Sequence, residues 1–558
     1  MEMHFATIWE SLADAIGDAD AVVQGPRRLT WTAYDSQAAR FAGFLRAHGI
    51  GGEASTAVHG QAKLGMYLYN SPEYLIAQYG AFKERLVPIN VNYRYLDNEL
   101  AYLIDNADME VLVYHASLAD RVARVKEQAP QVKLWIEVDD EGGQAPLSGS
   151  HAWSEVMASQ PASRITRSED DLYMLYTGGT TGMPKGVMYQ MGGFCGGLLL
   201  GYPILAQAAP PANAAAIAPF VKGFRDKIGG TLPKVIPACP LMHGTGVWLG
   251  AFLPAHLGAA VVLLESRNFD ADEFWRAVTD EGVTMAVIVG DAFAKPMVRA
   301  LDAAAARGTP FDTSALKLIM SAGVMWSSEM KAELLVHGDF ALADALGSSE
   351  ASMGMTMTTR QMSTETAKFT ANETTKVFFE DPQTGALRPV VPGSGEVGMV
   401  AAGGNTPMGY YKDEAKSDRT FKMVDGVRYS FPGDMGLINA DGSMTLLGRG
   451  SNCINTAGEK VFPEEVEESV KRHDAVFDCL VIGMPDEKFG ERVVAVASVH
   501  TSAKGVDASA LIAHVKSELA GFKAPKQVLI VDEVKRAPNG KADYGWAKEV
   551  ATAALSAP

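Results

Sequence analysis

Residues 172–187 read LYMLYTGGTTGMPKGV and are the most informative part of the sequence. An apolar run, residues 172–176, leads directly into a segment rich in glycine and threonine. The glycines allow backbone N–H groups to approach an anion closely, the threonines offer hydroxyl groups, and Lys185 adds a positive charge. These groups suit a polyphosphate, although the pattern is not the GxxxxGK[ST] loop, because Gly186 follows the lysine where that loop has a hydroxyl residue. A glycine-rich hairpin without a ligand is the alternative interpretation.

Short aliphatic runs alternate with helical patterns on both sides of this stretch. The runs are VLVYH (111–115), AAVVLLE (259–265), MAVIVG (285–290) and LKLIMSAG (316–323). Such alternation is typical of α/β folds, in which helices cover layered sheets. Among the helices, residues 268–282 show an apolar stripe that begins after Asp270, a good N-terminal cap.

The character of the sequence changes in its last third. Residues 375–447 contain short strands and glycine-rich turns, which indicates a smaller β-rich unit. A polar, glycine-rich boundary follows at 448–460, and after it helix and strand patterns alternate again. Residues 462–473 predict a helix that starts at Pro463, with acidic residues in its first turn. The sequence from about 453 to 558 therefore indicates a separate α+β domain.

The charge balance limits the partners of this chain. Its 558 residues include 49 Lys and Arg against 66 Asp and Glu, a formal net charge of −17, which repels nucleic acid and anionic lipid. Residues 186–221 carry no charge, but their glycines and prolines predict a buried helix and a loop, and no transmembrane segment. The N-terminus has no secretory signal, which favours the cytoplasm. The cysteines show neither metal-binding nor disulfide spacing: Cys195, Cys239, Cys453 and Cys479.

The glycine- and threonine-rich stretch resembles the phosphate loop of the adenylate-forming superfamily, which comprises acyl-CoA synthetases, peptide-synthetase adenylation domains and luciferases. Five other segments resemble motifs of that family, in the family's order. They are PLMHGTG (240–246), LGSSE (346–350), YSFPGDMG (429–436), GRGSNCINTAGEKVFPEEVE (448–467) and PNGKADY (538–544). The sequences of the segments at 448–467 and 538–544 are most similar to those of a bacterial branch of fatty acyl-CoA synthetases that includes enzymes for sterol side-chain acids.

The resemblance implies an α/β fold with two domains of unequal size. A large N-terminal adenylation domain, residues 1–448, would bind carboxylate and ATP, and would contain two layered α/β lobes and a small β-barrel-like unit. A hinge at 449–452 would join it to a small, mobile α+β domain at 453–558. In the family this second domain rotates between two reaction steps.

The resemblance also assigns the residues that would contact ATP or AMP. Glu350 is expected to hold Mg²⁺ together with Thr177, and Asp434 is expected to bind the ribose hydroxyls. Without the family, Glu350 is an ordinary loop acid, Asp434 a turn residue and Arg449 half of an interdomain ion pair. The expected ATP/AMP set is Thr177, Gly178, Gly179, Thr180, Thr181, Lys185, Gly323, Gly347, Ser348, Ser349, Asp434 and Arg449.

The remaining assignments concern the acid and the thiol acceptor. Lys541 would contact the carboxylate and the α-phosphate, although an exposed tail lysine is the alternative. His243 would lie beside the acyl carboxylate, or else be a histidine of the core. The expected catalytic set is Lys541, Glu350 and His243, the acyl-pocket set is His243, Gly193 and Gly197, and the CoA-binding set is Gly458 and Lys460.

Two positions depart from the family pattern. Leu346 stands where the family commonly has an aromatic residue that stacks on adenine, so the adenine contact must be aliphatic. Ser451 stands where the hinge usually has Asp or Lys. Neither departure removes a charge that the chemistry needs, but hinge energetics cannot be transferred from relatives.

The implied function is an ATP- and Mg²⁺-dependent carboxylic acid:CoA ligase that forms an acyl-AMP intermediate from a fatty or sterol side-chain type acid. An enzyme that loads a carrier protein, an aryl-alkanoate CoA ligase, a luciferase-type oxygenase and an inactive nucleotide sensor are the alternatives. The motifs do not identify the acid, because specificity depends on pocket shape. A homo-oligomer is compatible with the sequence, which does not determine the oligomeric state.

Overall fold

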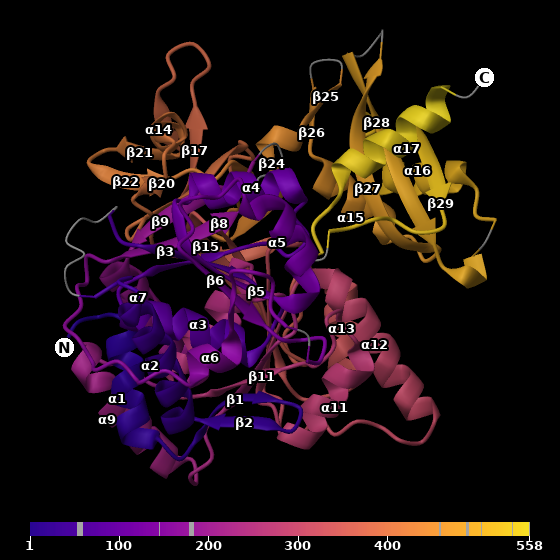
Figure 1. Ribbon diagram of the computed structural model, residues 1–558. Coiled ribbons are helices and arrows are strands. Elements are labelled where there is room, and N and C mark those ends of the chain that lie inside the picture. The colour runs from indigo at the N-terminus through magenta and orange to yellow at the C-terminus, as the bar shows by residue number, and fades with distance from the viewer. Residues whose placement is uncertain are drawn as a thin grey trace.

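The computed structural model describes residues 1–52, 60–143, 145–177, 183–456, 459–486, 490–503, 505–537 and 540–556. Figure 1 shows a large body that contains the N-terminus and a smaller part, coloured orange to yellow, that contains the C-terminus. The predicted α/β fold with a large N-terminal and a small C-terminal domain is therefore confirmed.

The first lobe is a sheet of five parallel strands in the order β4-β3-β5-β6-β7. Nearly all residues of its four longer strands are buried, as expected when helices cover both faces of a parallel sheet. The strands are β3 (Lys63–Tyr67), β4 (Val87–Asn90), β5 (Met109–His115), β6 (Leu134–Val138) and β7 (His151–Ala152). The helices of this region are α3 (Pro72–Lys83), α4 (Asp97–Asn106), α5 (Ala119–Lys126) and α6 (Trp153–Met157).

The second lobe contains a parallel half-sheet in the order β14-β13-β12-β10-β11-β1, with β2 antiparallel at the edge. Its strands are β1 (Asp20–Gln24), β2 (Arg27–Thr30), β10 (Lys234–Pro237), β11 (Ala260–Leu263), β12 (Met285–Ile288), β13 (Leu318–Ala322) and β14 (Ala341–Ser348). Helices α11 (Ala271–Glu281), α12 (Gly290–Ala306) and α13 (Ser328–Val336) lie beside it (Figure 1). Asp270 caps α11 as predicted, because its carboxylate accepts a hydrogen bond from the Glu273 N–H at 2.8 Å.

The β-rich unit continues this sheet. Strand β15 pairs antiparallel with β14, and the pairing extends through β16, β24, β23, β19 and β17 to β18. Because each strand hydrogen-bonds to the next, the junction leaves no open sheet edge between the lobes. The strands are β15 (Ala351–Thr358), β16 (Lys368–Ala371), β17 (Thr375–Glu380), β18 (Leu387–Pro389), β19 (Gly398–Gly403), β21 (Phe421–Val424), β22 (Val427–Ser430), β23 (Asp434–Ile438) and β24 (Met444–Arg449), with helix α14 (Glu414–Thr420).

A third, small sheet carries the informative stretch. It consists of β8 (Leu172–Thr177), β9 (Lys185–Gln190) and β20 (Gly409–Tyr410), and the hairpin register pairs Thr177 with Lys185. The charge-free segment after β9 forms α7 (Met191–Leu198), η2 (Leu199–Gly201), α8 (Tyr202–Leu205), η3 (Ala214–Ala216) and α9 (Ile217–Lys227). Within the described residues, no helix is both long and apolar enough to cross a membrane.

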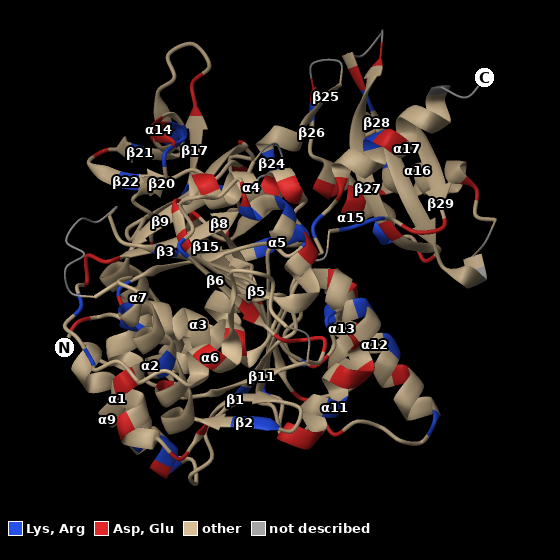
Figure 2. Ribbon diagram, in the orientation of Figure 1, with Lys and Arg blue, Asp and Glu red and all other residues tan. Residues whose placement is uncertain are grey.

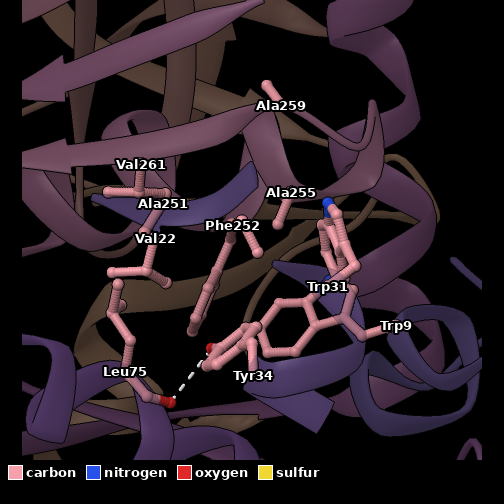
Figure 3. Close-up of a pocket in the computed structure, with 11 residues that line it drawn as sticks. Trp9, Val22, Trp31, Tyr34, Leu75, Ala251, Phe252, Ala255, Ala259 and Val261 are labelled. Atoms are coloured by element: carbon pink, nitrogen blue, oxygen red, sulfur yellow. Dashed lines mark hydrogen bonds between the residues drawn. The ribbon is translucent and has the colours of Figure 1, made fainter. Parts of the chain in front are cut away.

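The N-terminal helices pack against these lobes through aromatic side chains. They are α1 (Phe5–Ile16) and α2 (Trp31–Ala47), and the π-helical segment η4 (Thr245–Phe252) with α10 (Leu253–His256) lies against them. A small apolar cavity remains in this core, where the Tyr34 hydroxyl donates to the Leu75 carbonyl at 3.0 Å (Figure 3). No residue of the predicted site lines this cavity, so it is a packing gap.

The C-terminal domain is a separate sheet with helices on both faces. Its strands are β25 (Ile454–Thr456), β26 (Glu459–Val461), β27 (Val476–Asp486), β28 (Gly490–Val499) and β29 (Gln527–Val531). Its helices are α15 (Pro463–Lys471), which starts at Pro463 as predicted, α16 (Ala508–Glu518) and α17 (Tyr544–Ser556). The short turns η1 (Ala116–Leu118), η5 (Gly450–Asn452) and η6 (Thr501–Ala503) complete the described elements. Segment η5 lies between β24 of the body and β25 of the C-terminal domain, where we predicted the hinge.

Candidate active site

The hairpin of β8 and β9 places a lysine at the mouth of the predicted phosphate turn. Lys185 Nζ lies 2.6 Å from Asp413 Oδ2, and this hydrogen bond lowers the pKa of Asp413. Asp413 also caps α14, since its carboxylate accepts the Lys416 N–H at 3.0 Å. Of the predicted phosphate contacts, Gly178, Gly179, Thr180 and Thr181 lie outside the described residues.

The turn between β14 and β15 holds the predicted metal ligand. The Glu350 carboxylate accepts hydrogen bonds from the Tyr410 hydroxyl at 2.8 Å and from Ser349 Oγ at 2.9 Å. The Tyr189 hydroxyl donates to the Ser349 carbonyl at 2.6 Å and so joins this turn to β9. Burial, followed by the charge of Glu350, raises the pKa of Tyr410 and of Tyr189, so both hydroxyls stay protonated and donate. Each Glu350 oxygen retains acceptor capacity for a cation.

The predicted ribose ligand lies at the hinge end of the β-rich unit. Asp434 begins β23 and pairs in register with Arg449 at the end of β24. Arg449 Nε donates to Asp434 Oδ1 at 3.1 Å, and the Arg449 N–H contacts Glu464 Oε1 at 3.4 Å on α15. Burial raises the pKa of Asp434 and Glu350 adds to this effect, while Arg449 and Lys541 oppose it. Asp434, Glu350, Arg449 and Lys541 therefore belong to one electrostatic cluster.

Lys541 enters this cluster from the C-terminal domain. It lies on a tight turn in which the Ala537 N–H donates to the Lys541 carbonyl at 2.8 Å, and Gly540 has a φ of 73°, which favours glycine. Part of the Lys541 side chain is exposed, but many protein atoms surround it. This burial, and after it the charge of Arg449, lowers the pKa of Lys541, whereas the carboxylates of Glu350 and Asp434 raise it. The C-terminal domain is thus docked with its lysine facing the N-terminal cluster.

His243 faces the same region from the second lobe. Burial, and then the charge of Lys541, lower the pKa of His243 to about 4, so the imidazole is neutral at pH 7. Gly323 follows β13 with a φ of 92°, and a Cβ at this position would lie 3.5 Å from Thr245 Oγ1. The structure therefore brings the 240–246 segment next to Gly323, as the shared assignment to one site requires.

A family model described as "AMP-binding enzyme" matches residues 9–411, and one described as "AMP-binding enzyme C-terminal domain" matches residues 465–541. The chain belongs to the AMP-binding enzyme family. This finding confirms the predicted superfamily.

Curated relatives of this AMP-binding enzyme are CoA ligases. The medium/long-chain-fatty-acid–CoA/3-oxocholest-4-en-26-oate–CoA ligase of Mycolicibacterium smegmatis is 37% identical, over 99% of this chain and 97% of the relative. The 3-oxocholest-4-en-26-oate–CoA ligase of Rhodococcus rhodochrous is 38% identical, over 98% and 96%. These relatives confirm the predicted enzyme class, an acyl-CoA synthetase.

Solved structures share the fold of this AMP-binding enzyme over its whole length. The anthranilate CoA ligase AuaEII in complex with anthranoyl-AMP superposes with a TM-score of 0.80, at 18% identity and over 100% of this chain and 99% of that one. ATP-bound MatB from Rhodopseudomonas palustris gives a TM-score of 0.78, at 22% identity and over 99% of both chains. At these identities the likeness concerns the fold alone.

The predicted acyl-pocket glycines of the AMP-binding enzyme lie on α7. A Cβ on Gly193 would lie 2.9 Å from Asn405 Oδ1, and Asn405 Nδ2 donates to the Gly193 carbonyl at 2.5 Å. A Cβ on Gly197 would lie 3.7 Å from Asn405 Nδ2, whereas one on Gly196 would meet no atom within 4 Å. Asn405 thus leaves little room for a side chain at Gly193, and the roles of Gly193 and Gly197 in the acyl pocket stay predictions.

Aromatic side chains that we did not predict lie between α7 and the 240–246 segment. The Phe194 ring lies 5.1 Å from that of Trp248 and 4.9 Å from that of Tyr189. Trp248 Nε1 donates to the Tyr173 hydroxyl at 2.6 Å. These rings pack together in the core of the AMP-binding enzyme, and a Cβ on Gly244, the residue after His243, would lie 3.4 Å from Trp248 Cε3. The members of this aromatic cluster are separate in sequence, and no spacing pattern links them.

The two departures and the predicted CoA residues occupy different places. Leu346 is buried in the β-rich core, and Ser451 is exposed in η5. Lys460 is exposed on β26, where it pairs with Asn455, and Gly458 lies outside the described residues. The described contacts of Lys460 do not bring it into the cluster around Glu350.

A second cavity lies beside the 240–246 segment. Arg267 lies over the Tyr69 ring at 4.9 Å and pairs with Asp140 at 2.7 Å. The cavity combines aromatic and cationic groups with one carboxylate, and its lining includes Tyr69, Tyr93, Arg94, Pro240, Glu265, Arg267 and Phe293.

The lowered pKa of Lys541 predicts a pH effect. A lysine with a lowered pKa loses its proton below the ordinary value of about 10.4, so adenylation should decline on the alkaline side at a lower pH than for an ordinary lysine. In Lys541→Arg the guanidinium stays charged, so the alkaline decline of the residual activity should disappear. Exchange of pyrophosphate with ATP in the presence of the carboxylic acid substrate, measured between about pH 7 and pH 10.5, gives both profiles. Circular dichroism checks that both proteins are folded. An identical alkaline decline in both proteins would contradict the assignment.

Proposed function

We propose that this protein is an ATP-dependent ligase that converts a hydrophobic carboxylic acid into its CoA thioester through an acyl-AMP intermediate. The observation that carries the proposal is that the turn of Lys541 packs against Val289 and Ala292 of the N-terminal domain, where the lysine interacts electrostatically with Glu350, Asp434 and His243. A cytoplasmic location is part of the proposal.

In the first step, a carboxylate oxygen of the acid attacks the α-phosphorus of ATP, and pyrophosphate leaves. Lys541 stabilises the negative charge on the carboxylate and on the α-phosphate, since such preorganised charge is usually the largest contribution to catalysis. The Asp434 carboxylate accepts hydrogen bonds from the ribose hydroxyls. Lys185 gives up its ion pair with Asp413 and contacts a phosphate of ATP instead. Because His243 is neutral, it does not add a second positive charge beside the carboxylate of the substrate acid, and Lys541 remains the cation that interacts with that carboxylate.

The residues at this site fit a magnesium ion. The Glu350 carboxylate is oriented by Tyr410 and Ser349 and keeps free lone pairs, and Mg²⁺ typically takes one or two carboxylates together with phosphate oxygens and water. The Thr177 hydroxyl, at the end of β8, is the second protein group that we assign to the ion. When bound, Mg²⁺ would neutralise the charge of the ATP phosphates.

In the second step, the sulfur of CoA attacks the acyl carbonyl carbon, the bond to AMP breaks, and the thiol proton goes to solvent. Lys541 must leave the site, and a rotation of the C-terminal domain about the hinge at 449–452 brings Lys460 and Gly458 to the acceptor side. The domain boundaries at 448 and 453 belong to this proposal.

The second cavity suits the nucleotide end of CoA. CoA carries phosphates and an adenine ring, which arginines and aromatic side chains bind well. Arg94 is exposed on this cavity, and Pro240 connects the cavity to the segment of His243. We therefore assign Arg94 to the CoA phosphates.

The proposed acid is a medium- or long-chain fatty acid or a sterol side-chain acid. The relatives at 37% and 38% identity carry the names of ligases for such acids. The aromatic cluster of Tyr189, Phe194 and Trp248 packs beside α7, and a side chain at Gly196 on this helix would meet no protein atom within 4 Å. Loading of a carrier protein and use of aryl-alkanoates are the alternatives.

Lys541→Ala should separate the two steps. Loss of one preorganised charge contact should lower acid-dependent pyrophosphate release by about 10²- to 10³-fold, while thioester formation from supplied acyl-AMP and CoA stays near the wild-type rate. Single-turnover measurements of each step provide the test, and Lys548→Ala on α17 is a control in the same domain. Equal loss of both steps in Lys541→Ala would contradict the role of this lysine.

Arg94→Ala should affect the thiol acceptor only. Loss of a contact between a charged group and phosphate should raise the KM for CoA by about tenfold and leave acid-dependent ATP–pyrophosphate exchange unchanged. Arg388→Ala, which removes an exposed arginine on β18, is the matched control. An unchanged KM for CoA would place the nucleotide end elsewhere.

A panel of acids tests the proposed substrate class. Fatty acids of increasing length, a sterol side-chain acid and aryl-alkanoates should be compared by AMP formation with CoA present. We expect the fatty and sterol acids to give the highest kcat/KM. Aryl-alkanoates as the best substrates, or a carrier protein as the better acceptor, would support the alternatives.

A further inference from the structure

Helix α12 contacts the C-terminal domain at a point remote from the hinge. Lys295 Nζ donates to the backbone carbonyl of Phe477 and lies 4.7 Å from the centre of the Phe477 ring. Arg299, one helical turn further along, lies 4.4 Å from the same ring centre. Figure 1 shows α12 beneath α15 and β27, and Figure 2 shows charged residues of both signs where these elements approach each other. One aromatic side chain of the small domain is thus held by two cations of the large one.

The contact continues from Phe477 to the turn of Lys541. Asp478, the next residue, accepts two hydrogen bonds from Arg536, at 2.7 and 2.8 Å. Arg536 Nη1 donates in turn to the Gly540 carbonyl at 3.3 Å, and the Gly540 N–H donates to the Ala537 carbonyl at 2.8 Å. The lysine turn is therefore fixed relative to Phe477 through a short series of side-chain and backbone hydrogen bonds.

The same turn also rests directly on α12. A Cβ on Gly540 would lie 2.9 Å from the Ala292 Cβ and 3.4 Å from Val289 Cγ1, so this glycine permits close approach to the start of the helix. Ala292 and Lys295 are three residues apart in α12, so they lie about one turn apart on the same side of the helix. The first turns of α12 therefore hold the C-terminal domain at two places, one beside Lys541 and one at Phe477.

We propose that Lys295, Arg299 and Phe477 dock the C-terminal domain on α12 and thereby position Lys541 for the adenylation step alone. The inference rests on the proposed function. The three residues are positioning residues, because they reach the reacting atoms only through the Lys541 turn. Rotation of the domain for the thioester step must break their contacts, so the contacts favour one of two domain arrangements.

Removal of the ring gives the sharpest test. In Phe477→Ala, acid-dependent ATP–pyrophosphate exchange should fall by about tenfold, the size expected for loss of two cation–π contacts, while thioester formation from supplied acyl-AMP and CoA stays within about twofold. Phe477→Tyr keeps an aromatic face and should restore the exchange rate. Arg299→Ala should cause part of the loss seen in Phe477→Ala, and the double variant of Arg299 and Phe477 should lose little more than Phe477→Ala, because the contact of Arg299 with the ring is then already absent.

Arg307→Ala, at the far end of α12 and exposed, is the matched control and should leave both steps unchanged. Proteolysis at the hinge with ATP and acid present should be faster in Phe477→Ala than in wild type, since the docked arrangement is less populated. Equal loss of both steps, an unchanged exchange rate or additive losses in the double variant would each overturn the inference. Absence of exchange in wild type would instead refute the proposed function, so the two failures are distinguishable.

Discussion

The side-chain amide of Asn90 holds together the parts of the N-terminal domain on which the site depends. It is buried at the end of β4, donates to the Tyr176 carbonyl at 2.7 Å and the Met242 carbonyl at 2.6 Å, and accepts the Tyr176 N–H at 2.8 Å. A buried amide is costly unless its hydrogen bonds are made, so the three segments must meet in this arrangement. The phosphate hairpin after Tyr176 and the segment of His243 after Met242 are thereby fixed relative to each other. The side-chain amide of Asn70 fixes the same segment in a similar way, because it accepts a hydrogen bond from the Leu241 N–H at 2.8 Å and donates one to the Cys239 carbonyl at 3.2 Å.

The local charges explain how a chain of net charge −17 can bind anionic ligands. Lys185 pairs with Asp413, and Arg449 pairs with Asp434, so each of these cations already has a carboxylate partner. In the proposed mechanism an incoming phosphate would replace Asp413 as the partner of Lys185, and the ribose hydroxyls would share Asp434 with Arg449, so neither ligand would meet an unpaired charge. Lys541 differs because it comes from the other domain, and its charge reaches the cluster only while that domain is docked.

The proposed mechanism therefore depends on how the two domains contact each other. Arg449 contacts Asp434 of the N-terminal domain and Glu464 of the C-terminal domain, so the proposed ribose site and the proposed hinge share one residue. Helix α12 contacts the same domain at Phe477 and at Gly540, the residue before Lys541. The proposed rotation that releases Lys541 would therefore break the contacts of α12 and pivot near Arg449.

The sequence by itself determined the local features. The apolar strand before the glycine-rich turn, the helix capped by Asp270, the helix starting at Pro463 and the β-rich character of 375–447 follow from residue type and spacing, because turns and caps are made by neighbours in sequence. The family follows from the resemblance of six motifs in their order. Only the tertiary structure decided which distant residues meet. No sequence pattern predicts the contacts of Asn90, Tyr410, Asp413 or the pair of Lys295 with Phe477, because each residue contacts a partner 60 to 228 positions away. The continuity of the β-rich unit with the second lobe, and the filling of the space at Gly193 by Asn405, were decided in the same way. Hydrogen bonding across β14 and β15 and packing between elements depend on how the chain closes, which local propensity does not specify.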